Sequence, residues 1–376
     1  MTGKEKIFAA LSPEGTRDLP VTIPYEGVYS RDRWDELTSA PWWYRLSPKQ
    51  DHFLSYFEDV HKKLDQDWMS LLRTPRLGDD ENVTFTEDGA GRVWKTDRRT
   101  GSVQEFVRPP LGGGDMTEET HSARALPETP EQFEEFWPNT FIGDFVSMVL
   151  NPGAAQAAAA LFPSRCPITV VNSPLLSCFR LWGFEQTMTM FYDNPELLRY
   201  AIRSFLEAQM RTLTNCKDSG IQLLWLQDGY CDMISPDQYR TFGLPAIQEL
   251  VSTARSMGFY CVYCFMGDFN DRLNLLLEAG VHALALEEAK KGFTADVLEI
   301  AEAIKGRCAM VSNLDTVTLL EHGSEADLRA ELKRHRQAAK IMNGRFLYGL
   351  GSPITPGTSL KQLQTYFSIA REYSTL

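Results

Sequence analysis

Basic residues are in short supply in this sequence of 376 residues, which has 38 lysines and arginines against 50 aspartates and glutamates. The formal net charge of −12 disfavours binding to nucleic acid or to an anionic membrane, because both need surfaces rich in lysine and arginine. No apolar run approaches the roughly 20 residues that span a bilayer. We therefore expect a small molecule or another protein as the partner, with a homodimer left open.

Signals for secretion, for disulfides and for two common kinds of active site are also missing. The first residues, MTGKEKIFAALS, lack the apolar core of a signal peptide, and the seven cysteines are odd in number and without short regular spacing. Both features predict a protein of the reducing cytoplasm. No strand is followed by a complete glycine-rich phosphate loop, and no strand end offers the serine or cysteine elbow of a nucleophilic triad.

What the sequence does contain is a series of short apolar runs, rich in β-branched and aromatic residues, that end in Gly, Asp, Asn or Pro. Such runs predict buried parallel strands. Eight are present: LPVTIPYEG (19–27), NVTFTEDGAG (82–91), PITVVNSP (167–174), IQLLWLQDG (221–229), FYCVYCFMG (259–267), HALALEEA (282–289), CAMVSNLD (308–315) and RFLYGLGSP (345–353).

Helical patterns separate several of these runs. In NPELLRYAIRSFLEAQM, Asn194 can cap the helix and Pro195 suits its first turn, and in SPDQYRTFGLPAIQELVSTARSMG, Ser235 is the cap and Gly258 suits the end. Strands that alternate with helices eight times predict an α/β fold of the (β/α)8 TIM-barrel type, with an open doubly wound sheet as the alternative. We expect one domain over residues 1–376, with an aromatic-rich N-terminal extension (about 28–75) and a polar insertion (about 96–137) over the barrel mouth.

Polar residues stand at the C-terminal ends of the predicted strands, where the active sites of such barrels lie. They are Tyr25, Glu26, Glu87, Asp88, Asn172, Asp228, Cys264, Glu287, Glu288, Asn313, Asp315 and Ser352. Several carboxylates in one mouth would repel one another, so we expect a metal ion or a cationic group among them. Structural explanations compete with this one. The pair Asp228-Gly229 is common in turns, and Cys264 can be a small buried side chain.

Three longer stretches carry more specific information. They are LQDGYCDMISPDQYRTFGLPAIQELVSTARSMGFYCVYCFMGDFNDRLNLLLEAGVHALALEE, VSNLDTVTLLEHGSEADLRAEL and RFLYGLGSPITPGTSLKQLQTYFSIAREY. Together they resemble the uroporphyrinogen decarboxylase superfamily, including its cobalamin-dependent methyltransferase branch. The resemblance covers about residues 140–376, and the first third fits loosely through TFTEDGAGRVW. It implies a (β/α)8 barrel whose pocket accepts a tetrapyrrole-like or a methylated small substrate.

For a decarboxylase, the resemblance implies N-terminal arginines that hold propionate groups and an aspartate after the second strand. The corresponding segment here is PVTIPYEGVYSRDRW, in which only Arg31 and Arg33 can stand in, and both fall beyond the predicted strand. Glu87 or Asp88 lies near the expected place of the aspartate. A porphyrinogen decarboxylase is therefore disfavoured.

For a corrinoid-linked methyltransferase, the resemblance implies a zinc ion held by His-x-Cys after the fifth strand and by a cysteine in the last loop. Those positions are Cys264, Met266 and Ser352 here, and a thioether and a hydroxyl are poor replacements for thiolates. Zinc is then either absent or held by another set. Cys264, Asp228 and Glu288 would offer one thiolate and two carboxylates.

The leading hypothesis is a methyltransferase component that moves a methyl group from a small methylated compound, such as an aromatic methyl ether, to a separate corrinoid protein. The predicted catalytic residues are Asp228, Glu87 and Asp88 as general acids, and Tyr25. The predicted substrate-binding residues are Trp34, Trp43, Asn172, Asn313 and Ser352. The two tryptophans suit a lid over an aromatic substrate, and packing of an N-terminal helix onto the barrel is the slightly favoured alternative. The alternatives are a cofactor-free decarboxylase or lyase of the same superfamily, and a barrel that only binds a corrinoid or a tetrapyrrole.

Overall fold

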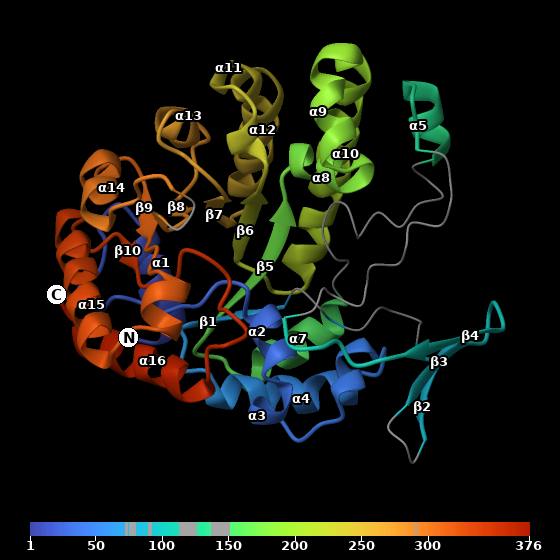
Figure 1. Cartoon of the computed structure of the whole chain (residues 1–376), viewed down its shortest axis with the longest axis horizontal. Helices are drawn as coiled ribbons and strands as arrows, with labels where there is room; N and C mark the ends of the chain where they lie inside the picture. The colour runs from blue at the N-terminus through green and yellow to red at the C-terminus, as the bar shows by residue number, and fades with distance from the viewer. Residues whose placement is uncertain (72–73, 75–79, 89–91, 113–125, 137–150, 290–291) are drawn as a thin grey trace.

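The computed structural model describes residues 1–71, 74, 80–88, 92–112, 126–136, 151–289 and 292–376. Its centre is a curled parallel sheet with helices around its outer face (Figure 1). The strands follow the order β1 (Trp68–Ser70), β5 (Cys166–Asn172), β6 (Leu223–Asp228), β7 (Tyr260–Phe265), β8 (Ala283–Leu286), β9 (Ala309–Val311) and β10 (Phe346–Leu347). The sequence predicts the last six of these strands, from β5 to β10.

The first predicted strand, residues 19–27, is not a strand, although it lies between the two edges of the sheet. On one side the Thr22 N–H donates to the Tyr348 carbonyl (2.9 Å), and a single parallel bridge joins Val21 to Tyr348. On the other side the Asp67 N–H, just before β1, donates to the Val21 carbonyl (2.8 Å). A helix begins at Glu26, so the run turns too soon to form a ladder. The described residues form a curled, barrel-like sheet of seven strands where the sequence predicts a closed barrel of eight.

The second predicted strand, residues 82–91, belongs to a different sheet. It contains β2 (Val83–Glu87), which pairs antiparallel with β3 (Val93–Asp97), and β4 (Ser102–Phe106) completes a small three-stranded sheet at the lower right of Figure 1. The Asp-Gly pair that follows Glu87 in the sequence is a hairpin signal, which explains the antiparallel pairing. The strand that pairs with β5 on the side away from β6 is β1, in the place that the sequence assigns to residues 82–91. Its three residues are too few to show a pattern in the sequence.

The helices that connect the strands start and end as the sequence predicts. Helix α10 (Pro195–Asp218) begins after Asn194, whose side chain accepts the Leu197 N–H (3.2 Å). Behind the Ser235 cap, α11 (Pro236–Gln238), η4 (Tyr239–Gly243) and α12 (Leu244–Ser256) run on without a break. Gly258 follows with φ 91°, a conformation that glycine adopts most readily.

The remaining helices lie before, between and after these. They are α1 (Gly3–Leu11), α2 (Glu26–Asp32), α3 (Trp34–Leu37), η1 (Trp42–Leu46), α4 (Gln50–Lys63), α5 (Pro130–Phe136), α7 (Pro152–Leu161), α8 (Pro174–Trp182), α9 (Phe184–Asp193), η3 (Cys231–Met233), α13 (Leu273–Glu278), α14 (Val297–Ile304), η6 (Thr316–Glu321), α15 (Glu325–Ile341) and α16 (Leu360–Tyr373). No helix in the described part of the chain is both long and apolar enough to cross a membrane.

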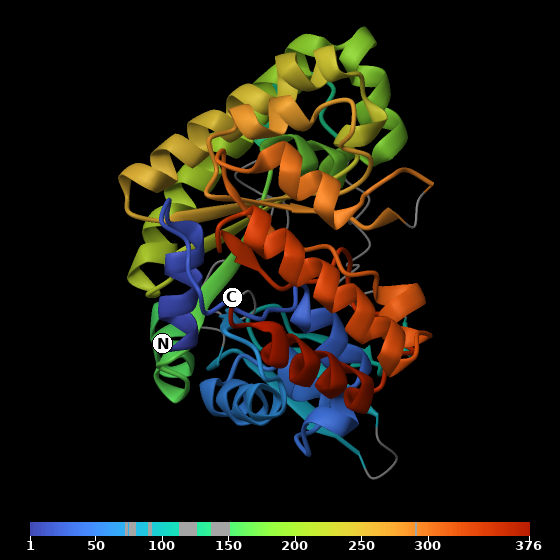
Figure 2. The same ribbon diagram turned by 90° about the vertical axis from the view of Figure 1, so that its left-hand side faces the viewer.

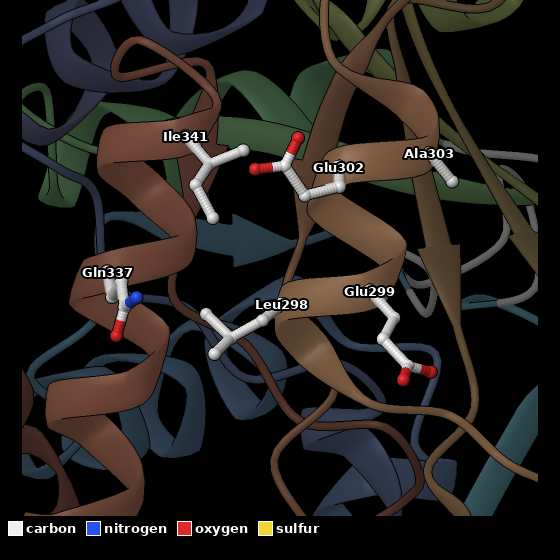
Figure 3. A pocket seen from close by; sticks show the side chains of 6 residues that line it. All are labelled: Leu298, Glu299, Glu302, Ala303, Gln337 and Ile341. Atoms are coloured by element: carbon white, nitrogen blue, oxygen red, sulfur yellow. The ribbon is translucent and has the colours of Figure 1, made fainter.

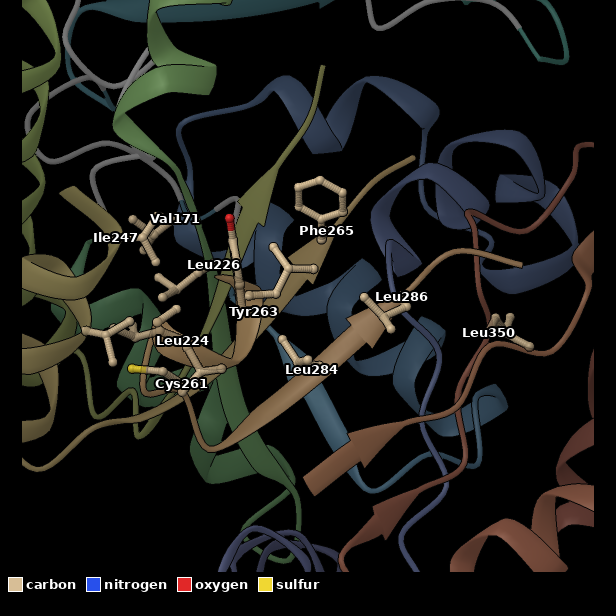
Figure 4. Close-up of a cluster of buried hydrophobic side chains, with 14 of the residues drawn as sticks. Val171, Leu224, Leu226, Ile247, Cys261, Tyr263, Phe265, Leu284, Leu286 and Leu350 are labelled. Carbon is tan, nitrogen blue, oxygen red and sulfur yellow. The ribbon is translucent and has the colours of Figure 1, made fainter. Parts of the chain in front are cut away.

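Alternate residues of each strand face opposite sides of the curled sheet. On the outer side, Leu224, Leu226 and Tyr263 belong to a large buried cluster that includes helix residues such as Ile247 of α12 (Figure 4). On the inner side, a second buried cluster contains Trp68, Cys166, Trp225, Val262 and Cys264, together with Ile7, Ala10 and Leu11 of α1. This inner cluster packs inside the lumen of the curled sheet, and the partly buried Tyr25, Val170 and Met266 lie at its edge. Figure 2 shows the sheet and its surrounding helices from the side.

The two predicted peripheral segments contact each other and the helices near the N-terminus. Within residues 28–75, Trp43 stacks on Phe85 of β2 with 5.6 Å between ring centroids. The described part of residues 96–137 includes β4 and α5, and Arg108 pairs with Asp35 of α3 (2.9 Å). That all of this forms a single domain stays a prediction.

Asp67 fastens the segment between the sheet edges, so its replacement should destabilise the protein. Its carboxylate accepts the Val21 N–H (2.7 Å) and pairs with Arg371 (2.5 Å), and the side chain is 8% exposed. Asp67→Asn should lower the free energy of unfolding by about 2 kcal/mol, because it weakens buried charge-assisted hydrogen bonds. Asp65→Asn is the control, since its carboxylate is 69% exposed and 3.4 Å from Arg371, and it should cost under about 0.5 kcal/mol. Equal losses in urea unfolding would contradict this role.

Candidate active site

Inner-face residues of neighbouring strands form a row near the C-terminal ends of the strands. The parallel register places Asn172 beside Gln227, Gln227 beside Cys264, and Cys264 beside Ala285. Gln227 and Met266, which follows β7, are half-buried, so solvent reaches this level of the lumen. The sequence-predicted residues Asn172 and Cys264 therefore share one row, two strands apart.

Tyr25 joins this row from the segment between the sheet edges. Its backbone has φ 57° and ψ 32°, a left-handed conformation that is uncommon for a residue other than glycine. Its hydroxyl lies 3.2 Å from the Cys264 Sγ, a residue 239 positions away in the sequence. Backbone strain of this kind concentrates at functional sites. The structure thus brings together two of the residues that the sequence predicts for the site.

Two tryptophans line the lumen beside this pair. The Trp225 ring meets the Tyr25 ring edge-on at 6.0 Å, and the Trp68 ring meets the Trp225 ring edge-on at 5.6 Å. Trp68 donates its indole N–H to the Ile23 carbonyl (3.0 Å), which fixes its orientation. The rings give this part of the lumen an apolar wall that suits a flat aromatic molecule. The sequence analysis missed both tryptophans, and only the inner parity of Trp225 on β6 could have indicated its place.

Burial and a neighbouring carboxylate keep the hydroxyl and the thiol protonated. Burial raises the pKa of Cys264 to about 12, and the charges of Glu287 and Asp228 add to the rise, while the hydrogen bond with Tyr25 opposes it. Burial also raises the pKa of Tyr25 well above its ordinary value, and Cys264 and Glu287 raise it further. At neutral pH both groups are neutral hydrogen-bond donors. We call Tyr25, Trp225, Cys264 and Glu287 the lumen site.

Asp228, the predicted general acid, points away from the lumen. It pairs in register with Phe265, which belongs to the outer cluster, and it is completely buried. Its carboxylate accepts hydrogen bonds from Ser173 Oγ (2.6 Å), Tyr263 OH (2.6 Å), Cys231 Sγ (3.0 Å) and the Gly229 N–H (3.1 Å). Burial raises the pKa of Asp228, although these bonds lower it. Asp228 therefore holds the loops behind the sheet together instead of meeting a substrate.

The two glutamates after β8 divide between two sets of partners. Glu287 continues the inner row of Ala283 and Ala285, and its charge acts on the lumen site. Glu288 instead accepts the Ser352 hydroxyl (2.8 Å) and the Thr316 hydroxyl (3.4 Å). The sequence selected Glu288 for the site, whereas the structure gives that place to Glu287.

Asn313 and Ser352, predicted to bind substrate, have structural partners. The Asn313 amide donates to the carbonyls of Glu287 (3.2 Å) and Ala295 (2.9 Å), which fixes the loop after β8. Ser352 is buried and donates to Glu288. Both residues support the backbone around the lumen site, and neither contacts Tyr25 or Cys264 in the bonds described.

The zinc set predicted from Cys264, Asp228 and Glu288 does not assemble. Asp228 faces the outer helices, Glu288 faces Ser352, and Cys264 contacts Tyr25. Within the described ranges, no three His, Cys, Asp or Glu side chains are placed to hold a metal ion. The Met266 thioether is also a poor zinc ligand. The residues present do not fit a resident zinc ion.

Glu87, Asp88 and Trp43 lie on or against the three-stranded sheet, away from the ends of the curled sheet's strands. Glu87 is exposed and accepts the Trp43 indole N–H (3.0 Å), and Asp88 pairs with Arg92 (2.7 Å). Because β2 is a hairpin strand, these residues do not stand at a strand end of the curled sheet, and their predicted catalytic and substrate-binding roles stay predictions. The resemblance implies an aspartate after the second strand of the barrel. In the structure β1 takes the place of that strand, and it ends at Ser70.

Trp34 is a core residue of the N-terminal extension and not part of a lid. It is 2% exposed, donates to the Ala40 carbonyl (2.6 Å) and packs against Tyr56 with 4.9 Å between ring centroids. The explanation as helix packing is the one that the structure supports for this residue. Trp34 therefore belongs to the packing of the N-terminal extension.

Glu26 is a buried carboxyl next to the lumen site that the sequence placed at a strand end without a role. Its carboxylate accepts the Ser70 N–H (2.6 Å) and the Gln66 amide, and it lies 3.5 Å from His61 Nε2. Burial raises the pKa of Glu26 to about 7, against these two hydrogen bonds. Burial and Arg165 lower the pKa of His61 to about 3. Gln66 also accepts the Ile23 N–H (3.2 Å), so the cluster holds both sides of the Tyr25 turn.

Cations are absent from the strand walls of the lumen. None of the seven described strands of the curled sheet contains a lysine or an arginine. Arg31 and Arg33, the two arginines that the resemblance could use, pair with Asp32 (2.9 Å) and Glu36 (2.7 Å). The strand walls therefore offer no cation to the carboxylates of a substrate.

A separate hollow of about 630 Å³ opens between α14 and α15 on the outside of the molecule (Figure 3). It is lined by Leu298, Glu299, Glu302, Ala303, Gln337 and Ile341. None of these residues belongs to the lumen site, and all come from helices that cover the sheet. The hollow therefore has no part in the chemistry of the lumen.

The sequence model of one protein family, described as "Uroporphyrinogen decarboxylase (URO-D)", matches residues 154–373. The chain belongs to the uroporphyrinogen decarboxylase family. Uroporphyrinogen decarboxylase of Xanthomonas axonopodis pv. citri is 26% identical over 198 residues, which cover 48% of this chain and 52% of that protein. The chloroplastic uroporphyrinogen decarboxylase 2 of Arabidopsis thaliana is 21% identical over 245 residues, 64% of this chain and 59% of that protein. The matches span about half the length of these relatives.

A solved structure resembles the chain along its whole length. A methyltransferase from Methanosarcina mazei superposes with a TM-score of 0.67, covers 99% of each chain and is 17% identical in sequence. At this identity the likeness shows the fold alone. The resemblance predicted from the sequence is confirmed at the level of the family, and the reaction is left to the geometry of the site.

Asp228→Ala should destabilise the protein by about 3 kcal/mol or more, because several buried donors lose a shared acceptor. Asp237→Ala, at an exposed position in α11, is the control and should cost under about 0.5 kcal/mol. Chemical unfolding of both variants measures the difference. An Asp228→Ala protein of unchanged stability that lost only its activity would restore Asp228 as a catalytic acid.

The raised pKa of Glu26 should make stability depend on pH. Because this pKa is about 7 in the folded chain and 4.5 ordinarily, the protonated carboxyl stabilises the folded state below pH 4.5, and this contribution disappears as the pH rises through 7. From pH 4 to pH 8, the free energy of unfolding of Glu26→Gln should therefore rise by roughly 3 kcal/mol relative to that of the wild type. Urea unfolding at several pH values tests this, with the exposed Glu299→Gln as control. Parallel pH profiles for wild type and Glu26→Gln would show that Glu26 is ionised in the folded protein at pH 5–6.

Proposed function

We propose that the protein transfers a methyl group from a small aromatic methyl ether to a corrinoid carried by a partner protein. The observation that carries the proposal is the Tyr25 hydroxyl, held by a left-handed turn 3.2 Å from Cys264 in a lumen walled by aromatic rings. Because the strand walls hold no lysine or arginine, such a lumen favours an uncharged aromatic substrate. Membership of the family and the fold shared with a methyltransferase support the proposal.

In the proposed reaction the methyl C–O bond of the ether breaks, the methyl group passes to a nucleophile, and the oxygen keeps the electron pair. The corrinoid would supply the nucleophile when its carrier protein docks, and no residue of this chain is assigned to hold it. Tyr25 donates a hydrogen bond to the leaving oxygen. Since burial puts the pKa of Tyr25 well above that of an ordinary phenol, Tyr25 stabilises the phenolate without losing its own proton.

The other members of the lumen site keep Tyr25 in this state. The Glu287 charge raises the pKa values of both Tyr25 and Cys264, so both remain protonated and able to donate. The contact with Cys264 fixes the direction of the Tyr25 hydroxyl, and the rings of Trp225 and Trp68 limit the positions open to an aromatic substrate. Orientation of this kind contributes to catalysis by bringing the reacting atoms into line.

A decarboxylase is the second candidate, and the family match favours it. That reaction on a porphyrinogen needs cations to hold the propionate groups, and the resemblance also implies an acid after the second strand. The seven described strands of the curled sheet contain no lysine or arginine, and β1 ends at Ser70. Methyl transfer is therefore the better supported of the two.

Methylation of free cob(I)alamin by 1,2-dimethoxybenzene tests the proposal, because the absorbance of the cobalamin changes when it is methylated. The wild type should catalyse this reaction, and Tyr25→Phe should slow it by roughly 10²-fold, since one donor to the developing oxyanion is lost. Tyr44→Phe, in η1 and stacked on His52, should leave the rate unchanged. Release of carbon dioxide from uroporphyrinogen, with no methylation of cobalamin, would replace the proposal with the decarboxylase.

A further inference from the structure

Trp225 carries a buried hydrogen-bond donor that makes no well-formed hydrogen bond at the lumen site. Its side chain is 3% exposed, and its indole N–H has no hydrogen-bond partner of acceptable geometry among the described residues. A buried donor that lacks an acceptor costs about 1–3 kcal/mol, so such a group in a folded protein calls for an explanation. Trp68 and Trp34 differ in this respect, because each gives its N–H to a backbone carbonyl, at 3.0 and 2.6 Å.

The indole N–H lies close to two other donors, the Tyr25 hydroxyl and the Cys264 thiol. The Trp225 and Tyr25 rings meet edge-on at 6.0 Å, and the Tyr25 hydroxyl lies 3.2 Å from the Cys264 Sγ. Burial raises the pKa values of Tyr25 and Cys264, and the nearby indole donor opposes this rise in both. Neutral donors therefore converge here.

We infer that Trp225 and Tyr25 together bind the oxygen atom of an aryl substrate, the indole N–H and the phenol O–H both donating to that atom. The identity of the substrate rests on the proposed function, which this inference extends to a second residue and to the phenol product. While the ether is intact its oxygen is a weak acceptor. As the C–O bond breaks, negative charge gathers on the oxygen and both hydrogen bonds strengthen, so the pair favours the transition state over the ether.

The same pair selects among classes of methylated compound. A quaternary ammonium has no acceptor and would leave both donors unsatisfied, even though aromatic rings attract such cations. An aryl ether or a phenol satisfies both donors and stacks against the aromatic wall. The two donors therefore favour an aryl oxygen over a quaternary ammonium, against the attraction that the charge of Glu287 and the aromatic rings exert on a cation.

Calorimetric titration of the full-length protein with phenol, toluene and tetramethylammonium tests the inference. Trp225→Phe should weaken phenol binding about three- to tenfold, as expected for one lost hydrogen bond, and should leave toluene binding within about twofold. Trp34→Phe is the matched control, because its indole N–H is already bonded to Ala40, and it should bind phenol as the wild type does. Equal phenol binding by wild type and Trp225→Phe, or tighter binding of tetramethylammonium than of phenol, would overturn the inference.

A second measurement uses the unaltered protein. Cys264 is 7% exposed, and the other six cysteines are 2% exposed or less, so methyl methanethiosulfonate should modify Cys264 first. Phenol should slow this modification at least about fivefold at saturation, whereas toluene at equal occupancy protects less because no hydrogen bond holds it beside the thiol. Absence of protection by phenol would also overturn the inference.

The inference and the proposed function can fail separately. Phenol binding that depends on Trp225, without any methyl transfer, would reject the proposed function and keep this binding site. Methyl transfer with phenol binding that does not depend on Trp225 would keep the proposed function and reject the inference.

Discussion

The alternation of side chains along β6 and β7 determines which groups can act together. The register that pairs Gln227 with Cys264 sends Trp225 and Cys264 into the lumen and sends Asp228 and Tyr263 toward the helices. A shift of one residue would exchange these sets completely. The register is fixed from both sides, because large buried clusters occupy the lumen and the outer face of the sheet.

Tyr25 depends on a second constraint, the short segment that passes between the sheet edges. Asp67 holds Val21 at one end of this segment, and Gln66 joins Ile23 to Glu26 across the Tyr25 turn. These bonds offset the cost of a left-handed conformation at a tyrosine, which is of the order of 1–2 kcal/mol. The hydrogen bonds around this turn thus set the position of the Tyr25 hydroxyl. Glu26 lies next to Tyr25 in this turn, and because burial raises its pKa to about 7, its charge changes near neutral pH.

The family, the α/β class and six of the seven sheet strands could be predicted from the sequence, because long apolar runs with clear stops identify parallel strands. The three-residue strand β1 could not, and a hairpin strand with a similar composition took its place, which misassigned Glu87 and Asp88. The direction of Asp228 and the choice between Glu287 and Glu288 depend on strand parity near the last residue, where an error of one position reverses the answer. Tyr25 and Cys264 were found because both stand at chain positions that the fold brings to the lumen. Trp225 was missed because a tryptophan within an apolar run is normally interpreted as a residue of the hydrophobic core.

An experimental structure of the protein with an aryl methyl ether bound tests the central claim most directly. The aromatic ring should lie in the lumen against Trp225, with the ether oxygen within about 3.2 Å of both the Tyr25 hydroxyl and the Trp225 indole nitrogen. An ether bound in the hollow between α14 and α15, or bound in the lumen with its oxygen away from both donors, would contradict it.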